Sequence, residues 1–320
     1  MRSGRRALLG GFAGLPAPAL AQGVEAWPIR PVRIIVPYPP GGTTDIVARH
    51  FAEFMRTRLA QPMIVENRPG AQTNIGTEAV ARAPADGHTL LFGATSLASN
   101  PVFGPAITGV DPQTALDPIG MLVRIPYMVA ANPRFAANRA ADLIAMARHA
   151  PGSFTIASAQ LDFQIALLNH ESRFRLEHVG YRGGAPAMTD AIAGQVDMVF
   201  ALVPVLLAAV RNGALKAIGI TARQRSGLLP DVQTFLETGQ STAVTDAWFA
   251  LFAPAGTPQS IISRLAADTR AYTQDADARG RLAELGIEPS PATPEELRAT
   301  LRDLTEEYRA LVRSMPAVQR

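Results

Sequence analysis

The chain has 320 residues, of which 48% are hydrophobic and 18% are charged, and it contains no cysteine. This length favours two medium-sized domains over one. The lack of cysteine excludes a disulfide framework and a thiolate metal site. The formal net charge is +3, but residues 1–21 hold three arginines and no acidic residue, so the remainder is close to neutral. The sequence has no basic run with interleaved aromatic residues, which argues against nucleic acid as a partner.

The first 21 residues have the pattern of a secretory signal peptide. Arg2, Arg5 and Arg6 precede an apolar run, and the small residues Ala19 and Ala21 frame a cleavage site. We therefore expect cleavage near Ala21 and export to the periplasm. The adjacent arginines leave both the Sec route and the twin-arginine route open.

Residues 33–49 predict a strand, a tight loop and the start of a helix. An apolar run at 34–36 is followed by three prolines and two glycines at 37–42, and then by cap-type residues at 43–45. Apolar residues continue at helical spacing as far as Leu59. The start of such a helix offers backbone N–H groups and a partial positive charge to an anion. Asp45 is expected to stabilise this helix start and not to contact a ligand.

Strand and helix patterns then alternate, with strands at 64–65 and 89–92 and a helix at 75–83. This alternation predicts a mostly parallel sheet covered by helices. Polar loops follow the three strands, at 41–44, 72–74 and 95–100, and should meet at one edge of the sheet, where ligands bind in open α/β folds. From this half we expect ligand contacts by Tyr38, Pro40, Gly41, Gly42, Thr43, Thr44, Thr73, Asn74, Thr95 and Ser96.

Two apolar runs between residues 119 and 132 indicate a crossing into a second domain. There the pattern predicts helices at 140–149, 163–171 and 203–210 and strands at 154–157, 178–179, 196–200 and 215–220. A strand at 248–252 returns to the first domain, and helices at 259–272 and 294–312 close the chain. The division predicted is 22–124 plus 248–320 for lobe 1 and 125–247 for lobe 2.

Short motifs at consistent spacing run through the whole mature chain. They include residues 38–42 with Asp45, the turn at 66–70, residues 178–187, and the segment 248–258 that begins with Trp248. Together they resemble the tripartite tricarboxylate transporter substrate-binding receptors, the Bug family of periplasmic solute-binding proteins. The resemblance implies an α/β fold of two lobes, the type II periplasmic-binding fold, in which each lobe is a mostly parallel sheet flanked by helices and the ligand cleft lies between the lobes.

The resemblance also implies a function. A small organic acid would be held between the lobes and handed to a membrane permease, by a monomer without catalytic activity, cofactor or metal. Gly183 and Gly184 repeat in lobe 2 the close backbone approach of the first loop. From lobe 2 we expect ligand contacts by Ser158, Ala159, Gln160, Tyr181, Gly183, Gly184, Ala185 and Pro186.

Residues 157–164 depart from the family pattern. Relatives carry a glycine-rich loop with Ser or Thr here, whereas this chain has no glycine and places Asp162 beside the expected pocket. Ala201 stands where relatives often have an acidic residue. A carboxylate would be repelled by a nearby carboxylate, so a neutral or cationic ligand remains an alternative to an organic acid.

Two other functions also remain open. The same scaffold serves as the ligand sensor of a signalling partner or, as the less favoured hypothesis, as an enzyme. The five histidines show no metal-ligand spacing, and residues 41–44 lack the lysine of a phosphate-binding loop.

Overall fold

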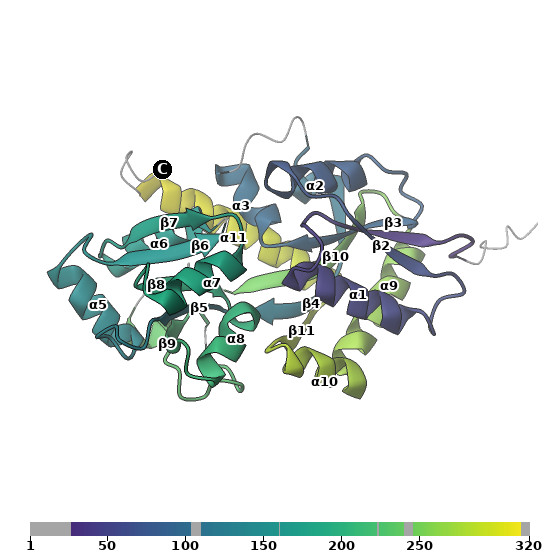
Figure 1. Cartoon of the computed structure of the whole chain (residues 1–320). Helices are drawn as coiled ribbons and strands as arrows, with labels where there is room; N and C mark the ends of the chain where they lie inside the picture. Colours follow the sequence, from purple (N-terminus) through teal and green to yellow (C-terminus); the bar gives the residue numbers. More distant parts are fainter. Residues whose placement is uncertain (1–26, 104–109, 160, 223, 240–245, 315–320) are drawn as a thin grey trace, which may run out of the picture.

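The computed structural model describes residues 27–103, 110–159, 161–222, 224–239 and 246–314. The expected signal peptide at 1–21 and the predicted contact residue Gln160 lie outside these ranges. The described strands form two sheets, one of six strands and one of five. Figure 1 shows the sheets side by side, each with its own helices; lobe 1 contains strand β1 and lobe 2 contains strand β5.

The sheet of lobe 1 has the order β11-β4-β10-β3-β1-β2. Strands β2, β1 and β3 are neighbours and run parallel, so their carboxyl ends lie at one edge. The bounds are β1 (Val32–Val36), β2 (Met63–Asn67), β3 (Thr89–Ala94), β4 (Leu116–Ile125), β10 (Ala247–Pro254) and β11 (Glu288–Ala292).

The sheet of lobe 2 has the order β7-β6-β8-β5-β9. Its parallel strands β7, β6 and β8 are again neighbours. The bounds are β5 (Tyr127–Ala131), β6 (Thr155–Ala159), β7 (Glu177–Tyr181), β8 (Met198–Leu202) and β9 (Lys216–Ile220).

Most strands of each sheet run in the same direction, as predicted, but both sheets also contain antiparallel strands. In lobe 1, β10 runs antiparallel to β3 and β4, and β11 runs antiparallel to β4. In lobe 2, β5 runs antiparallel to β8 and β9. Both sheets are therefore mixed, because β5 and β10 enter their lobes from the junction and run against the strands that end there.

The helices cover both sheets. They are α1 (Thr43–Met55), α2 (Asn74–Ala81), α3 (Ser96–Phe103), α4 (Pro112–Ala115), α5 (Ala140–His149), α6 (Asp162–Ser172), α7 (Gly184–Ala193), α8 (Val203–Arg211), α9 (Gln259–Gln274), α10 (Ala276–Glu284) and α11 (Pro294–Ser314), with short 3₁₀ turns at Ala71–Thr73 and Leu236–Thr238. Most agree with the sequence pattern to within a few residues.

The sequence pattern does not predict α3, α10 or β11. Asn100 and Pro101 are typical of a turn, and residues 95–100 are therefore expected to form a loop. In the structure Leu97 and Ala98 are buried in the core, so packing overrides the local preference and a helix begins at Ser96.

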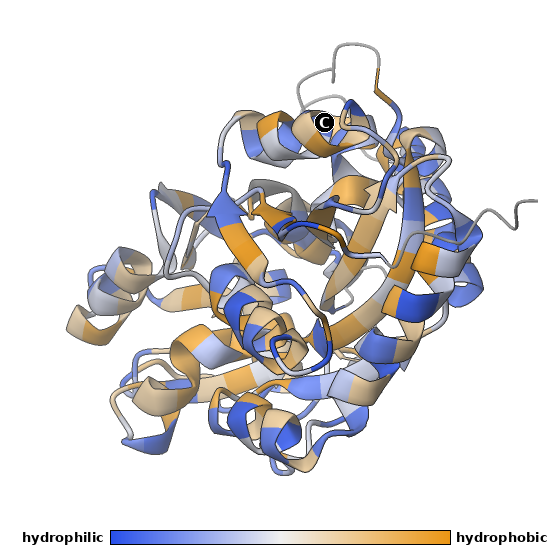
Figure 2. Cartoon of the chain, turned by 90° about the vertical axis from the view of Figure 1, so that its right-hand side faces the viewer, coloured by the Kyte–Doolittle hydropathy of each residue, from blue (hydrophilic) through white to orange (hydrophobic). Residues whose placement is uncertain are grey.

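The core consists of three hydrophobic clusters. One belongs to lobe 1 and includes Phe51 and Tyr272, and one belongs to lobe 2 and includes Met128 and Leu206. The third cluster extends through both lobes. Figure 2 shows the strands as largely hydrophobic, with hydrophilic residues mainly on the outer helices and loops.

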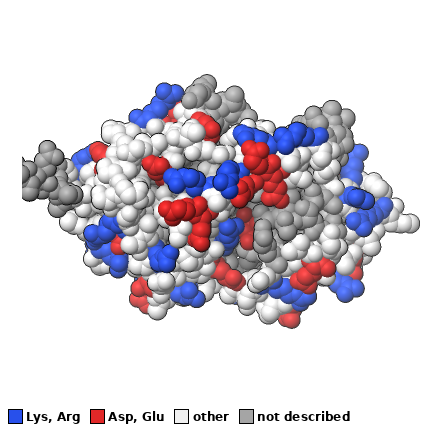
Figure 3. Space-filling model, turned by 180° about the vertical axis from the view of Figure 1, so that it is seen from behind, with Lys and Arg blue, Asp and Glu red and all other residues white. Residues whose placement is uncertain are grey.

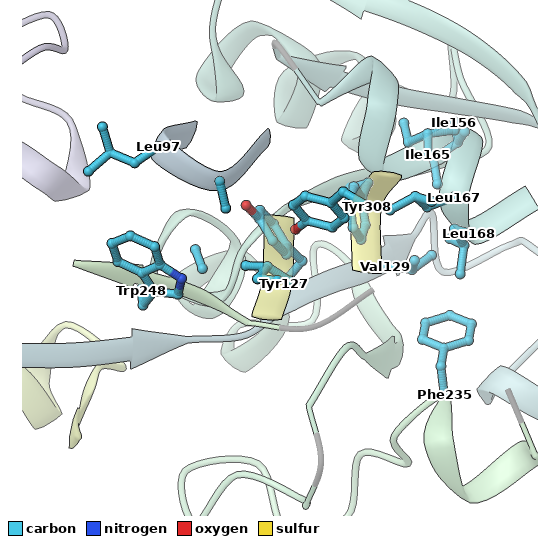
Figure 4. Close-up of a cluster of buried hydrophobic side chains, with 14 of the residues drawn as sticks. Leu97, Tyr127, Val129, Ile156, Ile165, Leu167, Leu168, Phe235, Trp248 and Tyr308 are labelled. Atoms are coloured by element: carbon cyan, nitrogen blue, oxygen red, sulfur yellow. The ribbon is translucent and has the colours of Figure 1, made fainter. Parts of the chain in front are cut away.

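Helix α11 joins the two lobes. In Figure 1 it runs from the sheet of lobe 1 to lobe 2, and its Tyr308 packs edge-on against Phe103 of α3. Figure 4 shows Tyr308 next to Tyr127 at the start of β5, with Trp248 of β10 close by. Since these side chains are almost fully buried, the junction of the lobes is a packed core and not a simple linker.

In the described part of the chain, no helix has the length and apolar character needed to cross a membrane. On the face seen in Figure 3, acidic and basic side chains lie close to one another over much of the surface. Ion pairs such as Arg298–Asp117 and Arg30–Asp86 join acidic and basic side chains in the described part of the chain. The residues described on that face therefore form no continuous basic surface.

Candidate functional site

The loops after β1, β2 and β3 meet at the edge of the lobe 1 sheet, as the sequence predicts. Tyr38 follows β1, Thr73 follows β2, and Ser96 follows β3. The Tyr38 hydroxyl lies 3.0 Å from Ser96 Oγ, and Thr73 Oγ1 donates to Ser96 Oγ at 3.1 Å. The convergence of three predicted contact residues is thus confirmed by direct hydrogen bonds.

A strained turn precedes helix α2. Ala71, Gln72 and Thr73 all have positive φ, at 45°, 51° and 80°. Residues other than glycine rarely adopt this left-handed region, and such strain collects at functional sites. Asn100 of α3 holds the turn, because its Nδ2, which carries two hydrogens, lies within hydrogen-bonding distance of three acceptors: Gln72 O at 2.5 Å, Asn74 Oδ1 at 2.9 Å and Thr73 Oγ1 at 3.2 Å.

Asn100 is a site residue that the sequence analysis missed. Residues 95–100 are polar enough to mark a functional loop, but Asn100 beside Pro101 is typical of a turn. Its role depends on α3, which brings it against residues 26 to 28 positions earlier in the chain.

Asp45 organises the loop between β1 and α1. Its carboxylate accepts hydrogen bonds from Gly41 N–H at 2.9 Å, Arg49 Nε at 3.0 Å and Asn67 Nδ2 at 2.9 Å. Burial opposes its ionisation, but these donors together lower the pKa of Asp45 below its ordinary value of 3.8. These contacts fit the prediction that Asp45 stabilises its helix start.

The first turn of α1 is open to a ligand. Gly42 is the N-cap, and within the described residues no side chain caps this helix. A Cβ on Gly42 would meet only Pro39 O, at 3.8 Å, among the described atoms. Pro40, Gly41 and Gly42 are exposed, Thr43 is half-buried and Thr44 is buried. The backbone N–H groups of this turn are thus available to an anion.

The other predicted residues of lobe 1 support the cluster. Asn74, the first residue of α2, is buried and bonded to Asn100. Thr95 is also buried, and its Oγ1 accepts a hydrogen bond from the backbone N–H of Trp248 at 3.0 Å. Thr95 therefore ties α3 to the strand that returns from lobe 2.

Ser158 of lobe 2 is turned into the protein. It is fully buried, and its Oγ lies 2.8 Å from His178 Nε2 on the neighbouring strand β7. Ala159, at the end of β6, is paired with Tyr181. Because side chains alternate along a strand, Ser158 and Tyr181 point to opposite faces of the sheet, and the structure does not bring them together.

Tyr181 bonds to its own following helix. Its hydroxyl donates to Asp190 Oδ2 of α7 at 2.6 Å, and this hydrogen bond raises the pKa of Tyr181. Gly183 is the N-cap of α7, with Ala185 and Pro186 exposed in the first turn, and the described residues provide no side-chain cap. The Gly184 backbone lies close to α8, since a Cβ there would meet Val205 at 3.1 Å.

The electrostatics of the site come from backbone groups and hydroxyls. The hydrogen bonds recorded for Tyr38, Thr73, Ser96 and Asn100 among the described residues involve no Lys or Arg. The described residues also contain no group of three or more His, Asp or Glu side chains placed to hold a metal ion. In Figure 1, α1 of lobe 1 and α7 of lobe 2 stand on opposite sides of the junction.

A separate hollow of about 420 Å³ lies on lobe 2, and none of the predicted contact residues lines it. Its lining includes Asn138, Lys216 and Asp231. Lys216 Nζ donates to Phe135 O and, at 2.8 Å, to Asn138 Oδ1. This lysine therefore holds the loop after β5 in place, and none of the residues hydrogen-bonded in the lobe 1 cluster lines the hollow.

Comparison with known sequences shows which protein family the chain belongs to. It matches the family described as "Tripartite tricarboxylate transporter family receptor" over residues 47–316. The chain belongs to this family. Protein BugT of Bordetella pertussis (strain Tohama I) is 34% identical over 314 residues, which cover 95% of this chain and 94% of BugT. The predicted membership of the Bug receptors is therefore confirmed.

Solved structures of receptors are similar to this one. R. palustris Rpa4515 with adipate gives a TM-score of 0.79 at 26% identity, covering 90% of this chain and 97% of that protein. MatC (Rpa3494) from Rhodopseudomonas palustris with bound malate gives 0.76 at 29% identity, covering 89% and 100%. The two-lobed periplasmic-binding fold of this receptor family is thus confirmed.

Proposed function

We propose that this receptor captures a small carboxylic acid between its lobes in the periplasm and delivers it to a tripartite tricarboxylate-type permease. The observation that carries the proposal is the convergence of Tyr38, Thr73 and Ser96 beside the uncapped start of α1. Relatives with the same fold hold adipate and malate, both dicarboxylates. The protein acts as a monomer and turns over no substrate.

A carboxylate suits this arrangement for a physical reason. Its oxygens accept several hydrogen bonds, and backbone N–H groups with hydroxyls supply donors without burying a side-chain cation. The starts of α1 and α7 are both uncapped among the described residues. One helix start in each lobe is therefore available for one end of a dicarboxylate.

In this proposal the ligand contacts of lobe 1 come from residues 38–44 and from Thr73, Asn74 and Ser96. Those of lobe 2 come from Ala159, Gln160 and the first turn of α7, with Tyr181 and Ser158 as supports. The lobes comprise 22–124 plus 248–320 and 125–247. They close over the ligand by bending where the chain crosses at Pro126, between β4 and β5.

The test is isothermal titration calorimetry of the mature protein with mono-, di- and tricarboxylic acids, including malate and adipate, with amino acids and neutral sugars as controls. We expect saturable binding of a carboxylic acid at one site, a smaller radius of gyration in solution scattering with the bound acid, and an unchanged acid after long incubation. If the controls bound and no carboxylic acid did, the proposal would be wrong. Conversion of the bound acid would favour an enzyme instead.

A further inference from the structure

The hydroxyl groups of Thr73, Ser96 and Tyr38 form a chain of hydrogen bonds in lobe 1. Asn100 determines the direction in which these hydroxyls donate. The side-chain atom of Asn100 that lies 2.5 Å from Gln72 O must be its nitrogen, because a backbone carbonyl only accepts. The same nitrogen lies 3.2 Å from Thr73 Oγ1. An amide nitrogen donates but does not accept, so the Thr73 hydroxyl cannot donate to Asn100. It directs its hydrogen to Ser96 Oγ instead, at 3.1 Å.

In this chain of hydrogen bonds, one hydroxyl hydrogen has no acceptor among the three side chains. Thr73, Ser96 and Tyr38 carry one hydrogen each, and the two links between them use two. Either atom can donate in the link between Tyr38 and Ser96. Among the described residues the third hydrogen therefore remains on Tyr38 or on Ser96. Burial raises the pKa of Tyr38, so its phenol keeps its hydrogen at neutral pH.

The direction of donation from Thr73 towards Tyr38 determines which hydroxyl keeps the remaining hydrogen. Tyr38 and Ser96 are both half-buried, whereas Thr73 is 6% exposed. A hydrogen-bond chain that ran the other way would leave its last hydrogen on Thr73, whose side chain is almost fully buried. Asn100 prevents this, because its Nδ2 faces Thr73 as a donor.

We propose that the hydrogen left on Tyr38 or Ser96 is the side-chain donor that binds the ligand's carboxylate in lobe 1, and that Asn100 is the positioning residue that directs it there through Thr73. This inference rests on the proposed function and adds a chemical requirement. The group bound at this point must accept a hydrogen bond, as an ionised carboxylate does, because it meets an O–H that has no other acceptor among the described residues.

The test begins with Asn100→Asp, measured by isothermal titration calorimetry with malate and adipate. The change replaces the donor by an acceptor of the same shape, so that Thr73 donates to the new carboxylate and no hydrogen is left for the ligand. We expect the affinity to fall about tenfold or more, which corresponds to one hydrogen bond to a charged group. Ser99→Asp is the charge-matched control, because neighbouring helical residues face different directions, and it should change the affinity by less than about threefold.

A second comparison separates positioning from a merely structural role. Tyr38→Phe together with Ser96→Ala removes both places where the hydrogen can lie, and should weaken binding about as much as Asn100→Asp. Adding Asn100→Asp to that pair should cost no more than about twofold further, since the donor is already gone. If Asn100 had only a structural role, the combined variant would lose affinity by the product of the two separate fold-losses. Circular dichroism establishes that each variant is folded.

The outcomes distinguish this inference from the proposed function. If the wild-type protein binds an acid but Asn100→Asp binds it as well as Ser99→Asp does, or if the losses multiply, the inference is overturned and the receptor function stands. If Asn100→Asp does not fold, the Tyr38→Phe and Ser96→Ala pair decides: retained affinity overturns the inference, and a tenfold loss upholds it. If the wild-type protein binds no carboxylic acid, both proposals fall.

Discussion

The two lobes present their strand ends in different ways. In lobe 1, polar side chains from three parallel strand ends bond to one another across the edge, through Ser96. In lobe 2, two of the described polar side chains at the corresponding edge bond instead to a neighbouring strand or to the following helix, Ser158 to His178 and Tyr181 to Asp190. Lobe 1 thus offers oriented hydroxyls and a helix start, whereas lobe 2 offers a helix start and small side chains.

The difference suggests a division of roles. A set of preset donors recognises a chemical group, because each donor needs an acceptor in a defined place. Small side chains such as Ala159 and Ala185 instead leave space whose shape selects the rest of the ligand. On this account lobe 1 determines that the ligand carries a carboxylate, and lobe 2 determines which carboxylate is bound.

The largest expected effect is the loss of binding in Gly42→Val. The φ of Gly42 is −78°, and its only close neighbour among the described atoms is Pro39 O at 3.8 Å, so the fold tolerates the change. The new side chain would cover the first turn of α1. We expect affinity for the carboxylic acid to fall about a hundredfold or more, as two charge-assisted hydrogen bonds are lost. Calorimetry and a thermal melt measure the two effects.

Gly280→Val is the matched control for this change. Gly280 is exposed in α10, and a Cβ there would meet no described atom within 4 Å. The control should leave affinity unchanged and keep the free energy of unfolding within about 0.5 kcal/mol of wild type, because Val is slightly more favourable than Gly in a helix. Retained affinity in Gly42→Val would remove the start of α1 from the site and with it the contrast between the lobes.

Next in size is the effect of Asp45→Asn on stability. Asp45 is buried and accepts three hydrogen bonds, which an amide with a single acceptor oxygen cannot satisfy. We expect the free energy of unfolding to fall by about 2 kcal/mol at pH 7. Urea unfolding of the variant beside the wild type measures this loss.

The pH dependence of that loss provides an internal control. The pKa of Asp45 is lowered in the folded state from 3.8, so its ionised form stabilises the protein above that pH. As the pH falls from this value through the lower pKa of the folded state, the carboxyl becomes protonated and the stabilisation is progressively lost. The difference between wild type and Asp45→Asn should therefore be constant above about pH 5 and shrink below about pH 4. A difference that stayed constant down to acid pH would show that the charge of Asp45 has no part in holding the loop.

The smallest expected effect is that of Ser158→Ala in lobe 2. The change removes the buried partner of His178 Nε2 and should lower the free energy of unfolding by about 1 kcal/mol. Affinity should stay within about twofold of wild type, because the side chain points into the sheet. Ser153→Ala, at an exposed serine of the same lobe, is the control for stability. A large loss of affinity in Ser158→Ala would mean that lobe 2 also recognises the ligand through preset hydroxyls.

Sequence patterns predict lobe 1 better than lobe 2. Strand, loop and helix signals at 33–49 place Tyr38 and the start of α1 correctly, since local chemistry determines them. Asn100 is missed because its role depends on helix α3, which forms only through burial of Leu97 and Ala98. The Ser158 side chain points towards His178 because of the register in which β6 pairs with β7. The sequence of β6 alone does not determine this register.

The most direct test of the account is to identify the small molecule that the protein carries when it is purified from the periplasm without denaturation and then unfolded. Mass spectrometry of the released fraction should find a small carboxylic acid at about one molecule per chain, and Gly42→Val purified in the same way should release none. A released compound without an acidic group would contradict the account. So would a protein that carries nothing and binds no carboxylic acid in solution.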